Sequence, residues 1–205
     1  MIAFLHTSNV HIDRFEKLVR QFDTEIKTRH FVNEGLLKTA LEKGVLDENG
    51  FASMVSKIEL EQPQTTICTC STYGELCNNW QNVHRIDQPI IEYLVDNYSI
   101  IIVVFTVIST KVVTCKLINK VAKSKNKPIQ IIICDATDSW QYFENNDSAH
   151  YELSIATKVK TKTAEGEVVF LAQASMEGAK KHLNLLNIPI FTSPAFGIKY
   201  FLYND

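Results

Sequence analysis

The chain has 205 residues and a formal net charge of −2, with 45% hydrophobic and 21% charged residues. This composition excludes a disordered chain, and the length suits one large domain or two small ones. The near-neutral charge gives no electrostatic footprint for nucleic acid or an anionic membrane surface, so neither is expected as a partner.

Short apolar runs predict buried strands, in chain order Ile2–Leu5, Thr66–Cys70, Ile100–Phe105, Ile129–Cys134 and Val168–Ala172. The runs are solidly apolar rather than alternating, which is typical of parallel strands covered on both faces. Helical periods lie between them, at residues 12–22 and 108–122, and the C-terminal stretch 195–203 also reads as a helix. The alternation of strand and helix predicts an α/β fold with a parallel sheet.

A weak internal repeat divides the chain. An offset of 104 residues aligns Cys68–Ser71 with Ala172–Ser175, and an offset of 105 aligns Arg85–Pro89 with Ile190–Pro194. These matches occur in the same order, at the ends of apolar strands. They predict two similar α/β halves.

The cysteines indicate a reducing compartment. There are five, at positions 68, 70, 77, 115 and 134, without the spacing of a secreted disulfide framework. The N-terminal residues lack the basic region of a signal peptide, and the longest apolar run is too short to span a membrane. We therefore expect a cytoplasmic protein, and a homodimer is one possible assembly.

Short hydroxyl and amide side chains gather where the predicted strands end. In parallel α/β sheets, ligands bind beyond the carboxyl ends of the strands, near helix N-termini, where unpaired N–H groups favour an anion. The ordinary reading of each such residue is a helix N-cap, but two mirrored clusters favour a site for a small carboxylate. The candidate binding residues are Thr7, Ser8, Asn9, Ser71, Thr72, Thr106, Ser109, Gln173 and Ser175.

Cys70 is the sharpest catalytic candidate. It is expected at a strand end just before a helix that starts near Thr72, a place that lowers a thiol pKa and favours a thiolate base or nucleophile. The alternative is a small buried hydrophobe, which is what most free cysteines are. Cys68 and Cys115 are assigned to the core, whereas the role of Cys134 is left open.

The sequence gives little support for a metal or a cofactor. Cys68, Cys70, Cys77 and His84 could be arranged as four zinc ligands, but no second Cys-x-x-Cys pair follows. No glycine-rich phosphate loop and no nucleophile elbow is present. His6, His11 and His150 remain as candidate bases.

These motifs resemble the Asp/Glu racemase superfamily, which includes glutamate, aspartate and hydantoin racemases, maleate isomerase and arylmalonate decarboxylase. The resemblance is closest to a branch, largely without assigned activity, with Cys-Thr-Cys-Ser-Thr after a central strand, here Cys68–Thr72. Further landmarks are the segments Arg85–Pro89, Leu171–Met176 and Ser193-Pro194. The resemblance implies two pseudo-symmetric flavodoxin-like halves, residues 1–95 with 196–205 and residues 96–195, and a cofactor-free site at their interface.

The resemblance also implies a reaction. Family racemases use one cysteine from each half to remove and return the α-proton of a small amino acid or carboxylate. Cys70 matches the first cysteine, whereas Ala174 is expected at the position of the second, within Gln173–Ser175. Alanine has no proton to give, so Thr106, Ser109, Ser175, a histidine or water would have to act instead. A racemase-like isomerase is therefore expected, and a single-cysteine decarboxylase or a non-catalytic carboxylate binder are the alternatives.

Overall fold

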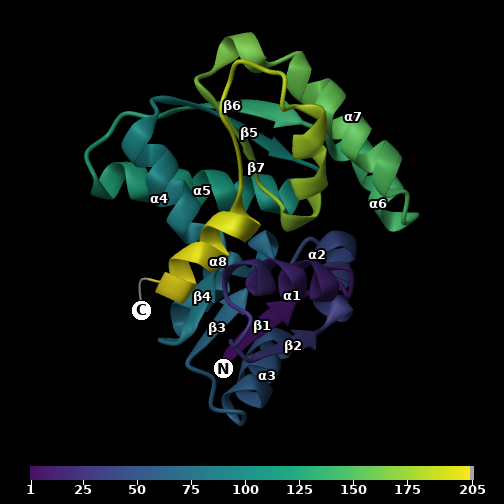
Figure 1. The fold of residues 1–205 in the computed structure, drawn as a ribbon, viewed down its shortest axis with the longest axis vertical. Helices are drawn as coiled ribbons and strands as arrows, with labels where there is room; N and C mark the ends of the chain where they lie inside the picture. Colours follow the sequence, from purple (N-terminus) through teal and green to yellow (C-terminus); the bar gives the residue numbers. More distant parts are fainter. Residues whose placement is uncertain (204–205) are drawn as a thin grey trace. The chain divides into compact units, whose positions relative to one another are not determined.

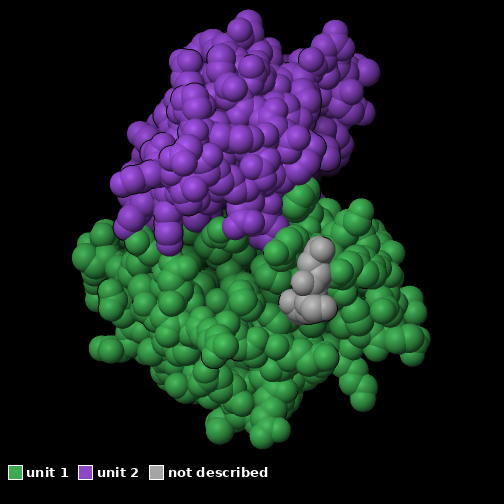
Figure 2. All heavy atoms as spheres, turned by 90° about the vertical axis from the view of Figure 1, so that its left-hand side faces the viewer, with its two compact units in different colours: residues 1–88, 194–205 green, residues 89–193 purple. Residues whose placement is uncertain are grey.

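The computed structural model describes residues 1–203, and the chain divides into two compact units. The first unit comprises Met1–Gln88 together with the residues from Pro194 onward, and the second comprises Pro89–Ser193 (Figure 2). None of the helices within the described residues is long and apolar enough to cross a membrane.

Each unit is built on a four-stranded parallel sheet (Figure 1). The first sheet has the strand order β2-β1-β3-β4, with β1 at Ile2–His6, β2 at Thr28–Val32, β3 at Thr65–Cys68 and β4 at Val83–Arg85. The second has the order β6-β5-β7-β8, with β5 at Ile100–Phe105, β6 at Gln130–Asp135, β7 at Val168–Leu171 and β8 at Ile190–Thr192. The predicted α/β fold of two similar halves with parallel sheets is confirmed.

Helices connect the strands and cover the sheets. Those in the first half are α1 (His11–Phe22), α2 (Glu34–Lys43), α3 (Glu48–Glu59), the 3₁₀ segment η1 (Ser71–Asn79) and α4 (Gln88–Asn97). Those that follow are α5 (Ile108–Ser124), η2 (Thr137–Ser139), α6 (Trp140–Glu144), α7 (Ser148–Lys160), η3 (Thr163–Glu165), η4 (Ala174–His182) and α8 (Ser193–Tyr203). Because helices cover both faces of each sheet, the central strands β1, β3, β5 and β7 are buried almost throughout.

The helix that follows the last strand of each sheet belongs to the unit of the other sheet: α4 follows β4 but belongs to the second unit, and α8 follows β8 but belongs to the first. From α4, Tyr93 contacts Phe191 of β8 with ring centroids 5.4 Å apart, and Asp96 pairs with Lys125 at 2.5 Å in the second unit. In the first unit, Phe201 of α8 lies 5.4 Å from the ring of His84 in β4. Figure 1 draws α8, in yellow, beside β4. The predicted C-terminal helix is confirmed, and it belongs to the first unit.

The hydrogen-bond register of the two sheets corrects the sequence repeat. Cys68 of β3 pairs with Leu5 in the first sheet, and Leu171 of β7 pairs with Val104 in the second. Cys68 therefore corresponds to Leu171, and the spacing between these two strands is 103 residues. The next amides repeat the pattern, because Thr69 N–H donates to the Leu5 carbonyl and Ala172 N–H to the Val104 carbonyl, each at 3.0 Å.

The same spacing continues into the segments that follow these strands. Cys70 directly precedes η1 and Gln173 directly precedes η4, and both segments are nine residues long. The amides of Tyr73 and Met176 donate back to the carbonyls of Cys70 and Gln173. Cys70 therefore corresponds to Gln173. The expected equivalence of Cys70 with Ala174 is wrong by one residue.

Candidate functional site

Cys70 follows β3 in the first unit, at the point where the chain turns into η1. Its side chain is partly buried against a core cluster that includes Tyr73 and Phe51. The sulfur is close to three donors: the Thr7 hydroxyl and the backbone N–H groups of Thr72 and Tyr73. Thr7 follows β1, and β1 lies next to β3, so the sheet brings the two strand ends together.

The electrostatics of Cys70 differ from the sequence expectation. Burial raises the pKa of its thiol to about 11, with a smaller contribution from Cys68, although the donors from Thr7, Tyr73 and Thr72 oppose that rise. A lowered pKa was expected, and this expectation is wrong because desolvation outweighs the hydrogen bonds. At neutral pH the thiol holds its proton, and the same donors are placed to stabilise the thiolate once the proton has left.

The other cysteines have distinct environments. Cys68 is 1% exposed, as expected for the core, and its pKa is raised chiefly by a hydrogen bond with Cys77. Cys134 is also buried. Cys115 is half-buried on α5 rather than enclosed in the core, so its assignment is only partly right. Among residues 1–203, no group of three or more His, Cys, Asp or Glu side chains is placed to hold a metal ion.

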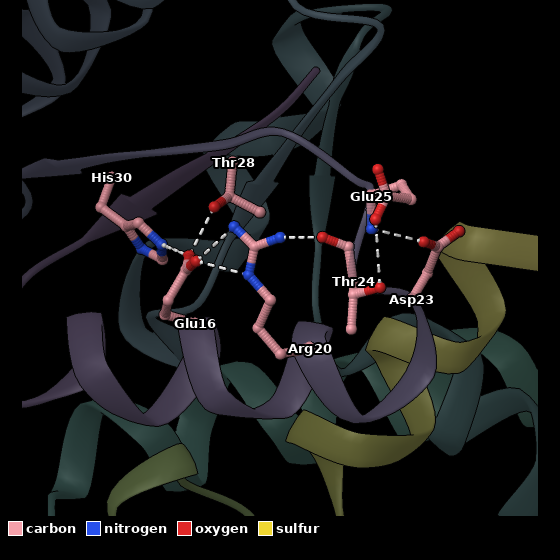
Figure 3. A network of polar contacts seen from close by, with 7 residues as sticks. All are labelled: Glu16, Arg20, Asp23, Thr24, Glu25, Thr28 and His30. Atoms are coloured by element: carbon pink, nitrogen blue, oxygen red, sulfur yellow. Dashed lines mark hydrogen bonds and ion pairs between the residues drawn. The ribbon is translucent and has the colours of Figure 1, made fainter.

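A chain of imidazoles lies beside this strand end. His6 Nδ1 is 2.7 Å from the Thr69 hydroxyl, and His6 Nε2 is 2.8 Å from His30 Nδ1. His30 Nε2 is in turn 3.2 Å from Glu16, which also accepts from Thr28 and Arg20 (Figure 3). Burial lowers the pKa of His6 to about 2, with additional effects from His11 and His30, so His6 is neutral and suits a hydrogen-bonding role rather than that of a base.

One arrangement of hydrogens satisfies this chain when both imidazoles are uncharged. Glu16 accepts from His30 Nε2–H, His30 Nδ1 accepts from His6 Nε2–H, and His6 Nδ1 accepts from the Thr69 hydroxyl. The chain ties β1, β2 and β3 together one residue before Cys70. It thereby fixes the strand ends that carry the thiol and Thr7.

In the second unit, Gln173 lies at the position that corresponds to Cys70. Its Oε1 atom accepts from the backbone N–H of Thr106 at 2.7 Å and from the Thr106 hydroxyl at 3.0 Å. Thr106 follows β5 as Thr7 follows β1, so the pairing of Thr106 with Gln173 repeats that of Thr7 with Cys70. Tyr151 of α7 extends the network, with its hydroxyl 3.0 Å from that of Thr106 and 2.9 Å from that of Ser175.

Sequence reasoning missed Tyr151, His30 and Glu16. Tyr151 lies on the apolar stripe of α7, and its hydroxyl meets a residue 45 positions earlier, so no local pattern marks it. His30 sits in a short strand of mixed polarity, and Glu16 on a helix face that reads as solvated.

The predicted binding residues all lie beyond or at the ends of strands within their own sheets, but they differ in accessibility. Asn9 is exposed and its N–H donates to Glu34, whereas Ser8 and Ser109 are half-buried. The remaining ones are buried: Thr7, Ser71, Thr72, Thr106, Gln173, Ala174 and Ser175. Each unit thus presents one cluster of hydroxyls and amides around a central position, held by Cys70 in the first and by Gln173 in the second.

Comparisons with known proteins bear on this fold. Neither protein-family models nor curated proteins match the sequence. Among solved structures, an aspartate racemase from Picrophilus torridus matches with a TM-score of 0.75 and 16% identity, over 94% of this chain and 88% of that one. A Francisella tularensis glutamate racemase in complex with D-glutamate matches with a TM-score of 0.75 and 12% identity, over 99% and 79%.

A third similar structure is the allantoin racemase from Klebsiella pneumoniae, with a TM-score of 0.68 and 11% identity over 97% of this chain and 84% of that one. At these identities the likeness is one of fold. The chain has the two-halved α/β fold of aspartate, glutamate and allantoin racemases.

Proposed function

We propose that this protein is a cofactor-independent enzyme of the racemase type that transfers a proton at the α-carbon of a small carboxylate or amino acid, with Cys70 as its reacting thiol. The observation that carries the proposal is the setting of Cys70, next to the Thr7 hydroxyl and the amides of Thr72 and Tyr73 at a strand end. The fold likeness to three racemases supports the same reaction class.

The chemistry of Cys70 suits proton donation. With a pKa of about 11, its thiol is protonated at neutral pH and is an effective acid toward a carbanion, which is far more basic. After the transfer, the sulfur carries the negative charge. The three neighbouring donors then stabilise it, and water restores the proton.

Gln173 favours a one-sided reaction. A carboxamide neither gives nor takes a proton near neutral pH, so the position that corresponds to Cys70 holds no second acid–base group. Two of the expected substitutes, the hydroxyls of Thr106 and Ser175, are both hydrogen-bonded to the Tyr151 hydroxyl.

This observation supports decarboxylation as a second candidate function. The bond between the α-carbon and one carboxylate breaks, CO₂ leaves, and the electron pair stays on the α-carbon as an enolate. The enolate then takes the proton of Cys70. The transfer comes from one face, so the product has one configuration.

The test is solvent deuterium exchange at the α-carbon. Wild type, Cys70→Ser and the matched control Cys115→Ser are incubated in D₂O with aspartate, glutamate, allantoin and 2-substituted malonates. Proton NMR follows the α-hydrogen and chiral chromatography follows configuration. We expect deuterium incorporation or CO₂ release that falls at least ~100-fold in Cys70→Ser and is unchanged in Cys115→Ser.

The possible results separate the candidates. Loss of optical activity in an amino acid supports racemisation, and a deuterated product of one configuration from a malonate supports decarboxylation. Ligand binding without any exchange in wild type contradicts the enzyme and leaves a carboxylate-binding protein. Equal exchange in wild type and Cys70→Ser assigns the chemistry to another residue.

A further inference from the structure

The edge strands of the two sheets differ in how they are protected against pairing with another chain. An edge strand presents a row of backbone N–H and C=O groups, and proteins guard it by keeping it short or by placing charged side chains on it. β4 and β8 are three residues long, and β2 carries the exposed Arg29, which pairs with Glu61. β6 has six residues, and only the last of them, Asp135, is charged. Its sequence therefore does the least to prevent pairing.

The backbone of β6 has one bonded side and one open side. At the two ends of the strand, the N–H groups of Gln130 and Ala136 donate toward β5. Successive residues of a strand direct their N–H and C=O groups to alternate sides, so the even-numbered residues of β6 bond to β5. The odd-numbered residues Ile131, Ile133 and Asp135 direct theirs to the other side, where β6 has no partner strand among residues 1–203.

The side chains of this open edge are apolar. Ile131, Ile132 and Ile133 are half-buried, whereas all residues of the neighbouring β5 after Ile100 are buried. A further strand at the open edge would place its own side chains beside these isoleucines and remove more of their surface from water. The unpaired backbone groups and the apolar side chains together fit another β-strand.

The charges that flank β6 favour a second copy of the same strand. Residues 120–127, before it, contain four lysines and no acidic residue, whereas residues 135–147 contain four acidic residues and no lysine or arginine. Antiparallel pairing of two copies brings the basic segment of each toward the acidic segment of the other. Lys125 and Asp138 each also have an ion-pair partner within the chain, at 2.5 and 2.7 Å. Exposed charges of this kind orient a complex more than they stabilise it.

We infer that the protein forms a homodimer in which β6 pairs antiparallel with β6 of a second copy. The second sheet of each copy, with four strands, then becomes half of one continuous sheet. A two-fold axis relates the copies, so the same strand supplies both sides of the contact and no open edge is left at β6. The inference concerns the second unit alone and is independent of the proposed reaction.

The first test is the oligomeric state of the full chain. Wild type, Ile133→Pro and the matched control Ile133→Val are compared by analytical ultracentrifugation over a range of micromolar concentrations. Proline has no N–H, and an edge position whose N–H faces outward tolerates it in the folded monomer. We expect wild type and Ile133→Val to be dimers, and Ile133→Pro to dissociate at least ~10-fold more readily. Circular dichroism checks that each variant is folded.

A second measurement needs no variant. Hydrogen exchange of wild type is followed by mass spectrometry at high and low protein concentration, on peptides that cover residues 129–136 and residues 28–33. The second peptide contains β2, the longest edge strand of the first sheet, and serves as the internal control. We expect dimer formation to slow exchange in the β6 peptide and to leave the β2 peptide unchanged, because only the outward amides of β6 gain partners.

Three results overturn the inference. A wild-type monomer at every concentration shows that β6 does not pair with its own copy and leaves the edge to a strand from a different protein. A dimer whose β6 peptide exchanges as fast as in the monomer has its contact elsewhere. An unchanged dissociation constant in folded Ile133→Pro has the same meaning.

Discussion

At the scale of single residues, burial rather than local position sets the properties of the titratable groups. A strand end followed by a helix predicts a reactive thiolate, but the neighbourhood of Cys70 raises its pKa to about 11. The sequence locates the residue because the motif is local. It does not predict the protonation state, because the desolvation comes from side chains distant in sequence.

His11 provides a test of the same principle. It is buried, its Nδ1 atom has no partner within residues 1–203, and burial lowers its pKa to about 3, with Arg14 as a second cause. His6 is lowered to about 2. Both are neutral in the folded protein but bind a proton in the unfolded chain below pH ~6.5. Their contribution to stability is present above that pH and is lost as the pH falls toward 3.

We predict that the free energy of unfolding drops on acidification from pH 6 to 4, with each histidine contributing up to about 1.4 kcal/mol per pH unit. His11→Phe removes one of the two histidines that bind a proton on unfolding, so the free energy of unfolding of this variant declines less steeply with falling pH. Urea unfolding at several pH values measures the slope, and His150→Phe, on the exposed surface, is the control. An unchanged slope in His11→Phe would mean that His11 is already accessible to protons when folded.

At the scale of elements, the long central strands are predictable and the short edge strands are not. The prediction for β5 matches at both ends, and β1 ends one residue late, because solid apolar runs mark strands covered on both faces. The strands β2, β4 and β8 were missed. These strands are three to five residues long, and their side chains are of mixed burial. They are held in place by hydrogen bonds to the adjacent strand of the sheet and not by an apolar pattern that the sequence would show.

The repeat shows how a register error arises. Small residues around Cys70 and Ala174 look alike in either alignment, and only the hydrogen bonds of the sheets choose the spacing of 103 residues. A shift of one residue exchanges the face on which each side chain lies. It also changes the residue that corresponds to Cys70 from Ala174 to Gln173, and with it the chemistry expected there.

The packing of α8 yields a prediction at this scale. A Cβ atom at Gly197 would lie 2.4 Å from the carbonyl oxygen of Ile86, which is backbone and cannot move aside cheaply. We expect Gly197→Ala to lower the free energy of unfolding by about 1–3 kcal/mol. Gly35→Ala in α2 is the control, since its Cβ would meet only the Asn33 side chain, at 3.1 Å. If both variants are as stable as wild type, α8 does not pack closely on the segment after β4.

At the scale of the whole molecule, the two halves share strand order, register and the pairing of a threonine with the residue before a 3₁₀ segment. The duplication was visible in the sequence because apolar strands recur in the same order. The divergence between halves was less visible, since Tyr151 and the His6–His30–Glu16 chain have no counterpart in the repeat. Those residues depend on contacts across each unit and not on any local motif.

The exchange of α4 and α8, each of which packs in the unit of the sheet that it does not directly follow in sequence, has a consequence for assembly. A chain cut between Tyr98 and Ser99 gives two fragments, each of which carries a helix that the other fragment's sheet requires. Neither fragment has a complete core, so each should be largely unfolded alone and fold on mixing by reciprocal exchange. Circular dichroism and analytical ultracentrifugation of the separate and mixed fragments measure this. Deleting α8 from the second fragment should abolish complementation, whereas two independently folded fragments would show that the crossing helices are dispensable.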